Sequence, residues 1–228
     1  REWIAIVDFG AQYTQLIARR IRESKVYCEI LPFDISAKDL RERAPTGIVL
    51  SGGPSSVYAA DAPHPDRAIF DLGIPVLGIC YGLQVIGHYL GGQVENGDNR
   101  EFGPATIRAE GGSELFRDLP ADLDVWMSHG DELIEVPDGF EIIARSGDGV
   151  IAAVAGQAQG VYGVQFHPEV VHTPQGAEIL KNFVYRICGC KGDWTAQAFI
   201  ESSIAEIRAT VGESRVVCFV SGGVDSTV

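Results

Sequence analysis

The chain has 228 residues, of which 46% are hydrophobic and 21% charged, as in ordinary globular proteins. A formal net charge of −13 argues against nucleic acid or an anionic membrane as the principal partner. Five cysteines, an odd number without dense spacing, do not form a secreted disulfide framework, so we expect a cytoplasmic protein. The longest apolar region, residues 74–90, contains Gln84, His88 and several glycines and does not predict a membrane span.

The first ninety residues alternate between short apolar runs and longer runs with apolar residues at helical spacing. Strands are predicted near residues 3–8, 26–32, 46–50 and 74–80, and helices near 12–24, 36–45, 64–73 and 82–92. Ser36 is a suitable residue to open the second of these helices. Strands that alternate with helices of this length predict an α/β fold with a mostly parallel central sheet flanked by helices.

The pattern changes after residue 92. Residues 93–164 contain short runs that predict an added section of antiparallel or mixed strands on one side of the sheet. A helix is predicted over 173–188, with Pro174 near its start, followed by the glycine-rich linker 188–193, a helix over 195–212 and a strand over 215–220. We expect one domain over 1–190 and, over 191–228, a linker and the truncated start of a second domain.

The stretch Gly78-Ile79-Cys80-Tyr81-Gly82 places a cysteine where an apolar strand gives way to a helix. It has the G-x-nucleophile-x-G form of a strand-to-helix elbow, in which glycines are required because the turn is tight. The start of the following helix favours negative charge, and therefore the thiolate. A buried packing cysteine is the alternative interpretation of this motif taken alone.

His167 and Glu169 stand two residues apart in the segment "GVQFHPEV". In an extended segment both side chains point to the same side. A cysteine nucleophile needs a base that is oriented by a carboxylate, and this pair supplies both groups. A surface His-Pro-Glu turn without chemistry is the alternative.

Gly52 and Gly53 follow the predicted strand 46–50 directly. In a parallel sheet their backbone N–H groups would lie near the elbow and could stabilise a developing oxyanion, although an ordinary strand-ending turn would have the same residues. Each of these three signals is weak alone. Together they complete one mechanism, which favours catalysis by Cys80.

These segments resemble the class I, triad-type glutamine amidotransferases, most clearly in "LSGGPSSVY", "GICYGLQ", "WMSHGD" and "GVQFHPEVVHTPQG". The resemblance implies a flavodoxin-like fold and hydrolysis of glutamine to glutamate and ammonia, without a metal or cofactor. It implies Cys80 as the nucleophile, His167 as the base and Glu169 as its orienting carboxylate. Backbone N–H groups of Gly53 and Tyr81 would be the oxyanion donors.

The same resemblance implies which residues contact glutamine. They are Gly52, Gln84, Ser128, His129, Gly130 and Asp131. His172 and Thr173 belong to the matching "VVHTPQG" segment, but the sequence leaves their role open.

The chain ends in a glycine turn that resembles the pyrophosphatase loop of an ATP-binding synthetase domain. The residues of this loop are Ser221, Gly222, Gly223, Val224, Asp225, Ser226 and Thr227. In a longer protein such a domain would use ATP and Mg²⁺ to aminate xanthosine 5′-monophosphate (XMP) with the released ammonia, and we expect that protein to be a homodimer. An ordinary strand-to-helix turn is the alternative.

Two rival functions fit the same sequence. A γ-glutamyl hydrolase or peptidase would use the same triad on peptide-like substrates, although the terminal loop argues against it. A non-catalytic glutamine-sensing domain would keep the fold without the reaction, yet such domains typically lose the nucleophile or its base, and this chain has both.

Overall fold

The computed structural model describes residues 2–219 and 221–223, apart from the side chains of residues 96–101, 196 and 202. The contacts within the chain define two compact units, Arg1–Asp193 and Trp194–Val228. The larger unit holds the sheet and every motif discussed above except the terminal loop.

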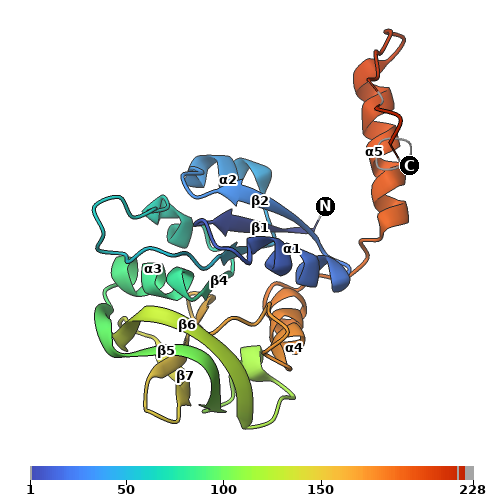
Figure 1. Cartoon of the computed structure of the whole chain (residues 1–228). Helices are drawn as coiled ribbons and strands as arrows, with labels where there is room; N and C mark the ends of the chain where they lie inside the picture. The colour runs from blue at the N-terminus through green and yellow to red at the C-terminus, as the bar shows by residue number, and fades with distance from the viewer. Residues whose placement is uncertain (1, 220, 224–228) are drawn as a thin grey trace. The chain divides into compact units, whose positions relative to one another are not determined.

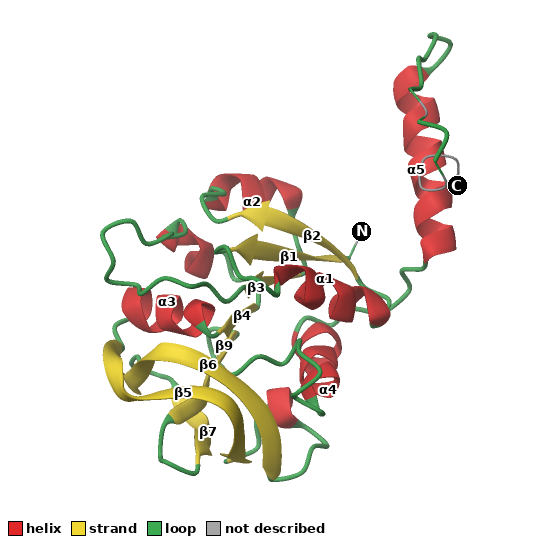
Figure 2. Ribbon diagram, viewed as in Figure 1, coloured by secondary structure: helices red, strands yellow, loops and turns green. Residues whose placement is uncertain are grey.

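The larger unit is built on one nine-stranded sheet in the order β2-β1-β3-β4-β9-β8-β7-β5-β6 (Figure 2). The strands are β1 (Trp3–Asp8), β2 (Tyr27–Pro32), β3 (Gly47–Leu50), β4 (Val76–Ile79), β5 (Gln93–Ala109), β6 (Asp122–Glu135), β7 (Glu141–Ser146), β8 (Ile151–Gly156) and β9 (Val161–Val164). The pairings from β2 to β9 are parallel, and those from β9 to β6 are antiparallel. The predicted α/β fold with an added antiparallel section is therefore confirmed.

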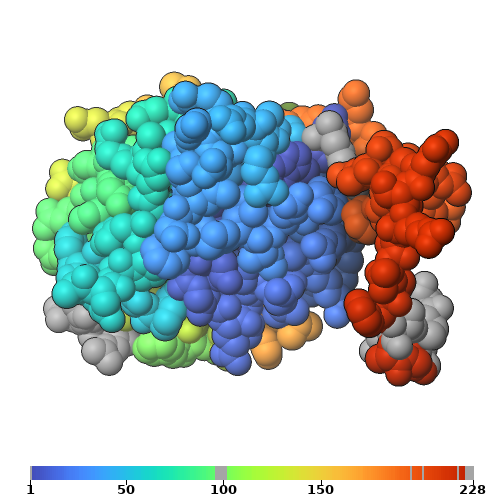
Figure 3. All heavy atoms as spheres, turned by 90° about the horizontal axis from the view of Figure 1, so that it is seen from above, coloured from blue at the N-terminus to red at the C-terminus, as the bar shows by residue number. Residues whose placement is uncertain are grey.

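Helices cover both faces of the sheet (Figure 1). They are α1 (Thr14–Glu23), α2 (Ala37–Arg43), α3 (Tyr81–Leu90) and α4 (Gly176–Lys181), with 3₁₀ turns η1 (Arg67–Asp71) and η2 (Glu114–Phe116) and a π-helical extension of α4, η3 (Asn182–Ile187). One buried cluster joins α1 and α4 to the sheet, and a second joins α2, η1 and α3 to it. The N-terminal residues, coloured blue, form the middle of the face seen in Figure 3.

Strand β1 shows why a parallel strand consists of a continuous apolar run. Ile4 and Ile6 belong to the cluster with α1 and α4, whereas Ala5 and Val7 belong to the cluster with α2 and α3. Successive side chains of a strand point to opposite faces, and both faces of this strand are covered. Burial on both sides suits an interior strand, and β1 lies between β2 and β3.

Several predicted elements differ in extent from the structure. The helix expected over 64–73 is only the 3₁₀ turn η1, since Pro63 and Pro65 restrict the preceding backbone. The strands after residue 92 are not uniformly short, because β5 and β6 form a long two-stranded ribbon. The helix expected from residue 173 begins at Gly176, two residues after Pro174.

The smaller unit contains helix α5 (Ala196–Val211), whose first turn is capped by the Thr195 hydroxyl. The strand expected over 215–220 is not formed by residues 215–219, and residue 220 lies outside the described residues. A strand needs a neighbour for its backbone hydrogen bonds, and α5 is the one regular element in the described part of this unit. Among the described residues no helix is long and apolar enough to cross a bilayer.

Candidate active site

Cys80 occupies the turn between β4 and α3 in a backbone conformation that side chains rarely adopt. Its φ is 52° and its ψ is −104°. Such strain costs of order 1–3 kcal/mol and persists only where surrounding contacts determine the conformation. Here the Cys80 N–H donates to the Val164 carbonyl at the end of β9 (2.8 Å), and the Gly82 N–H donates to Ser51 after β3 (3.1 Å).

The glycines on either side of Cys80 are required by close packing. A Cβ at Gly82 would overlap the Leu50 carbonyl at the end of β3, and one at Gly78 would lie 2.5 Å from the Gly82 carbonyl carbon. The helix start therefore rests directly on the neighbouring strand. This close approach positions the thiol at the carboxyl edge of the parallel strands.

His167 and Glu169 meet beside the elbow, after the end of β9. His167 Nδ1 lies 2.8 Å from Glu169 Oε1, and the two side chains are 7% and 1% exposed. The pair forms in a turn rather than along an extended strand, because β9 ends at Val164. A Cβ on Gly52 would lie 3.1 Å from His167 Cε1 and 3.7 Å from Cys80 Cβ, so all three residues share one small space.

Burial by itself lowers the pKa of the His167 imidazole. A hydrogen bond with Cys80 and the adjacent Glu169 carboxylate act in the opposite direction, and they raise the pKa from 6.5 to about 10. The imidazole therefore holds a proton firmly at neutral pH. An imidazole that holds a proton next to a thiol and a carboxylate has the electrostatics of an acid–base group in nucleophilic catalysis.

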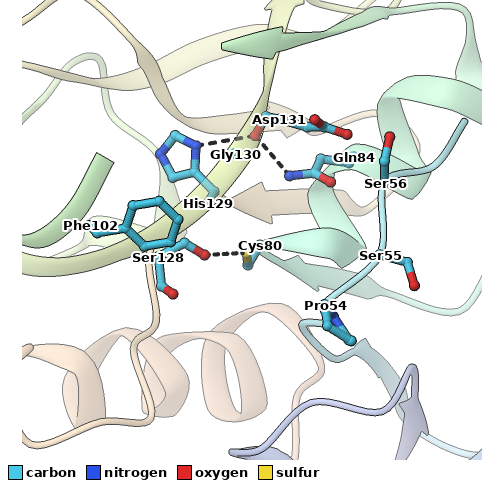
Figure 4. A pocket seen from close by; sticks show the side chains of 11 residues that line it. Pro54, Ser55, Ser56, Cys80, Gln84, Phe102, Ser128, His129, Gly130 and Asp131 are labelled. Carbon is cyan, nitrogen blue, oxygen red and sulfur yellow. Dashed lines mark hydrogen bonds between the residues drawn. The ribbon is translucent and has the colours of Figure 1, made fainter. Parts of the chain in front are cut away.

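A cavity of about 310 Å³ opens in front of the thiol (Figure 4). It is lined by Gly53, Pro54, Ser55, Ser56, Cys80, Gln84, Phe102, Ser128, His129, Gly130 and Asp131. This volume, with mostly polar walls, suits a small polar molecule of amino-acid size.

The structure brings most of the predicted glutamine contacts to this cavity. Gln84 Nε2 donates to the Asp131 carbonyl (2.9 Å), and His129 Nδ1 lies 3.1 Å from the same oxygen (Figure 4). The Ser128 carbonyl oxygen lies 3.5 Å from Cys80 Sγ. Gly52 does not line the cavity and packs against the His167 ring instead.

The two predicted oxyanion donors flank the thiol. Tyr81 is the first residue of α3, and the first N–H groups of a helix have no intrahelical acceptor. Within the described chain, the backbone N–H groups of Tyr81 and Gly53 donate to no other residue. A Cβ on Gly53 would lie 3.3 Å from the Tyr81 ring, so the two residues are close neighbours.

Three features of the site were not predicted from the sequence. Phe102, which is 68% exposed, and residues 54–56 complete the cavity wall. Gln165 is fully buried with its Nε2 3.7 Å from Cys80 Sγ, and it lies just before the predicted His-Pro-Glu segment. Ser51 accepts from the Phe9 N–H and donates to the Gly52 carbonyl, which fixes the turn after β3.

Of the predicted phosphate loop, the structure describes residues 221–223. Gly222 has a φ of 77°, a conformation that glycine favours, and the Gly223 N–H donates to the Ser221 hydroxyl (3.4 Å). The other members, Val224, Asp225, Ser226 and Thr227, lie outside the described residues. The loop as a phosphate site therefore stays a prediction.

Comparison with known families agrees with this geometry. Residues 5–187 match the family described as glutamine amidotransferase class-I. The chain therefore belongs to the class I glutamine amidotransferase family.

Within that family, the whole chain is similar to GMP synthases. It is 53% identical to the GMP synthase [glutamine-hydrolyzing] of Caldicellulosiruptor saccharolyticus and 52% identical to that of Bacillus subtilis, in each case over 227 residues. The alignments cover the full chain but 44% of each relative, so the chain spans less than half the length of these proteins.

Solved structures show the same fold. A Thermoplasma acidophilum protein described as a GMP synthase subunit superposes with a TM-score of 0.70 at 30% identity, over 91% of this chain and 97% of that one. A Thermotoga maritima glutamine amidotransferase superposes with a TM-score of 0.64 at 19% identity, over 82% of this chain and 98% of that one.

Proposed function

We propose that the chain hydrolyses glutamine through Cys80, His167 and Glu169, and that the ammonia serves an ATP-dependent amination of XMP to GMP in a longer protein. One observation carries the first part. A cysteine strained into an elbow stands between a buried imidazole–carboxylate pair and a polar cavity of amino-acid size. The alternative of a packing cysteine does not account for the strain.

The reaction begins with the Cys80 sulfur as a thiolate, because His167 already holds the proton. The sulfur adds to the side-chain amide carbon of glutamine bound in the cavity. The resulting oxyanion accepts hydrogen bonds from the backbone N–H groups of Tyr81 and Gly53. Glu169 stabilises the imidazolium and fixes its orientation.

The second half returns the site to its starting state. His167 donates its proton to the amide nitrogen, the carbon–nitrogen bond breaks, and ammonia leaves a γ-glutamyl thioester on Cys80. Water activated by His167 then attacks the thioester. His167 takes a proton from this water, the carbon–sulfur bond breaks, and glutamate leaves the Cys80 thiolate beside the protonated imidazole.

The second part of the proposal rests on similarity to GMP synthases and on the terminal loop. A synthetase domain would bind ATP with Mg²⁺ and XMP, and would yield GMP, AMP and pyrophosphate, in a homodimeric, cytoplasmic protein. Gly222 fits a turn that cradles phosphate, and the five unpaired cysteines suit a reducing compartment. By itself this chain should release ammonia but form no GMP.

Release of glutamate and ammonia from glutamine by the purified chain tests the first part. Cys80→Ala should lower the rate by about 10³-fold or more, because the nucleophile is lost. Cys218→Ala, which removes an exposed thiol outside the site, should leave it unchanged. A glutamine analogue with an electrophilic carbon at the amide position should alkylate Cys80, and glutamine should protect it.

The rival functions predict different results in the same assays. Faster hydrolysis of γ-glutamyl peptides than of glutamine would identify a γ-glutamyl hydrolase. Binding of glutamine without release of ammonia would identify a sensing domain. Ammonia release that Cys80→Ala leaves unchanged would refute Cys80 as the nucleophile.

A further inference from the structure

The segment after the catalytic pair turns back on itself. We call residues 167–176 the return loop, which runs from His167 to the first residue of α4. A Cβ on Gly176 would overlap the Pro168 carbonyl, so the two ends of the loop are in direct contact. The Gly176 N–H donates to the Thr173 carbonyl (2.9 Å), and the Thr173 N–H donates to Val170 (3.2 Å).

The side chain of Thr173 points into this closed loop. Thr173 is 3% exposed, and its hydroxyl donates to the His167 carbonyl at 2.7 Å. The same hydroxyl accepts a hydrogen bond from the backbone N–H of Trp126 in β6, at 3.1 Å. One hydroxyl therefore satisfies a buried acceptor on the base and a donor on the neighbouring strand.

The backbone of His167 is held to β6 from both sides. Its N–H donates directly to the Trp126 carbonyl (3.0 Å), and its carbonyl reaches the Trp126 N–H through Thr173. In a regular ladder, two residues would exchange both hydrogen bonds without an intermediary. His167 lies beyond the end of β9, whose neighbours in the sheet are β4 and β8, and the Thr173 hydroxyl supplies the second link to β6.

Strand β6 also forms the wall on the other side of the thiol. Ser128 stands two residues after Trp126, and its carbonyl oxygen lies 3.5 Å from Cys80 Sγ. The base and the cavity wall are thus attached to the same short stretch of strand. Their separation is fixed as long as His167 remains attached to Trp126.

We propose that Thr173 is a positioning residue of glutamine hydrolysis, whose hydroxyl fixes the backbone of His167 to β6 and so aligns the imidazole with Cys80 and Glu169. This inference rests on the proposed function. It gives a role to a residue whose function the sequence leaves open. Thr173 does not line the cavity, so its effect on the reaction is indirect and acts through the backbone that it holds.

The test compares Thr173→Val, which keeps the shape but removes the hydroxyl, with Thr173→Ser, which keeps the hydroxyl. Valine should lower kcat by about 10- to 100-fold, since a small misplacement of a catalytic group has this effect, with KM changed less than about twofold. Serine should keep kcat within about threefold of the wild type. Ser113→Ala is the matched control, because it also removes a buried hydroxyl. Ser113 is 4% exposed, and its hydroxyl accepts a hydrogen bond from the Leu115 N–H in η2.

A second readout separates positioning from general stability. Loss of the His167–Glu169 alignment should lower the pKa of His167 in Thr173→Val but not in Ser113→Ala. NMR of the His167 ring protons measures this pKa. Equal kcat and pKa in valine variant and wild type would overturn the inference, as would equal losses in Thr173→Val and Ser113→Ala.

The serine variant decides the question if the valine variant does not fold. Wild-type-like kcat in Thr173→Ser supports the role of the hydroxyl, and a loss above tenfold overturns it. Failure of the proposed function would look different. In that case the wild type itself would show no Cys80-dependent ammonia release.

Discussion

His167 is the residue on which most of the electrostatics of the site converge. The ring is buried, borders Tyr13 edge-on at 5.8 Å between centroids, and is hydrogen-bonded to Glu169. Burial alone would discharge it, whereas its two partners raise its pKa to about 10. The positive charge of the imidazole therefore depends on its neighbours. Loss of this charge by deprotonation should be visible in the pH dependence of the free energy of unfolding.

A raised pKa in the folded state means that protonation of His167 favours folding. The contribution of this proton to the free energy of unfolding should be complete below pH 6.5. It should disappear as the pH rises towards 10, and the free energy should fall by up to roughly 1.4 kcal/mol per pH unit. The free energy of urea unfolding, measured from pH 6 to 10.5, should therefore fall more steeply in the wild type than in His167→Asn. Equal slopes of the free energy of unfolding against pH in the two proteins would contradict the raised pKa of His167.

The residues of the candidate site were predictable to the extent that each stands beside a recognisable turn. Cys80 lies between glycines, and His167 and Glu169 flank a proline. Gln165 and Phe102 were missed because nothing in their local pattern separates a buried glutamine or a surface aromatic from its ordinary counterpart. Only the packing of β9 against β4, and of β5 against β6, brings them to the thiol.

At the scale of elements, the elbow depends on the contact between α3 and β3. The helix start lies against the end of the strand without an intervening side chain, since Gly82 faces Leu50. The sequence indicated the strand and helix, but the turn at His167 and the length of the β5–β6 ribbon depend on partners distant in the chain. Local periodicity carries no information about such pairing.

Gly82→Ala should separate α3 from β3. The added methyl overlaps a backbone carbonyl that cannot rotate away, so we expect a loss of about 1–3 kcal/mol in stability and a displaced thiol. Thermal unfolding and alkylation of Cys80 measure the two effects. Gly112→Ala, at a position with open space, is the control, and equal unfolding temperatures for both variants would refute the packing argument.

At the scale of the whole molecule, the two units differ in how they bury apolar side chains. Every residue of the two large buried clusters lies between Trp3 and Cys190. In the smaller unit, Ile200, Ile207 and Phe219 are 51%, 59% and 94% exposed. The larger unit thus has a complete hydrophobic core of its own.

Removal of residues 194–228 should therefore leave the larger unit folded. We expect the shortened protein to unfold within about 3 °C of the parent and to retain its rate of ammonia release, because neither core cluster nor cavity uses the deleted residues. Differential scanning calorimetry and the glutaminase assay measure both. A large drop in melting temperature would show that the smaller unit supports the core.

The backbone of Cys80 sets a trade-off between durability and reactivity. At a φ of 52°, glycine would be less strained than Cys80. The native fold therefore loses some stability at this position because it places a sulfur there. A descendant that no longer has to release ammonia would gain stability if this strained conformation were relieved. A relative with glycine at the position of Cys80 would then be an inactive protein with a higher free energy of unfolding than its active ancestor.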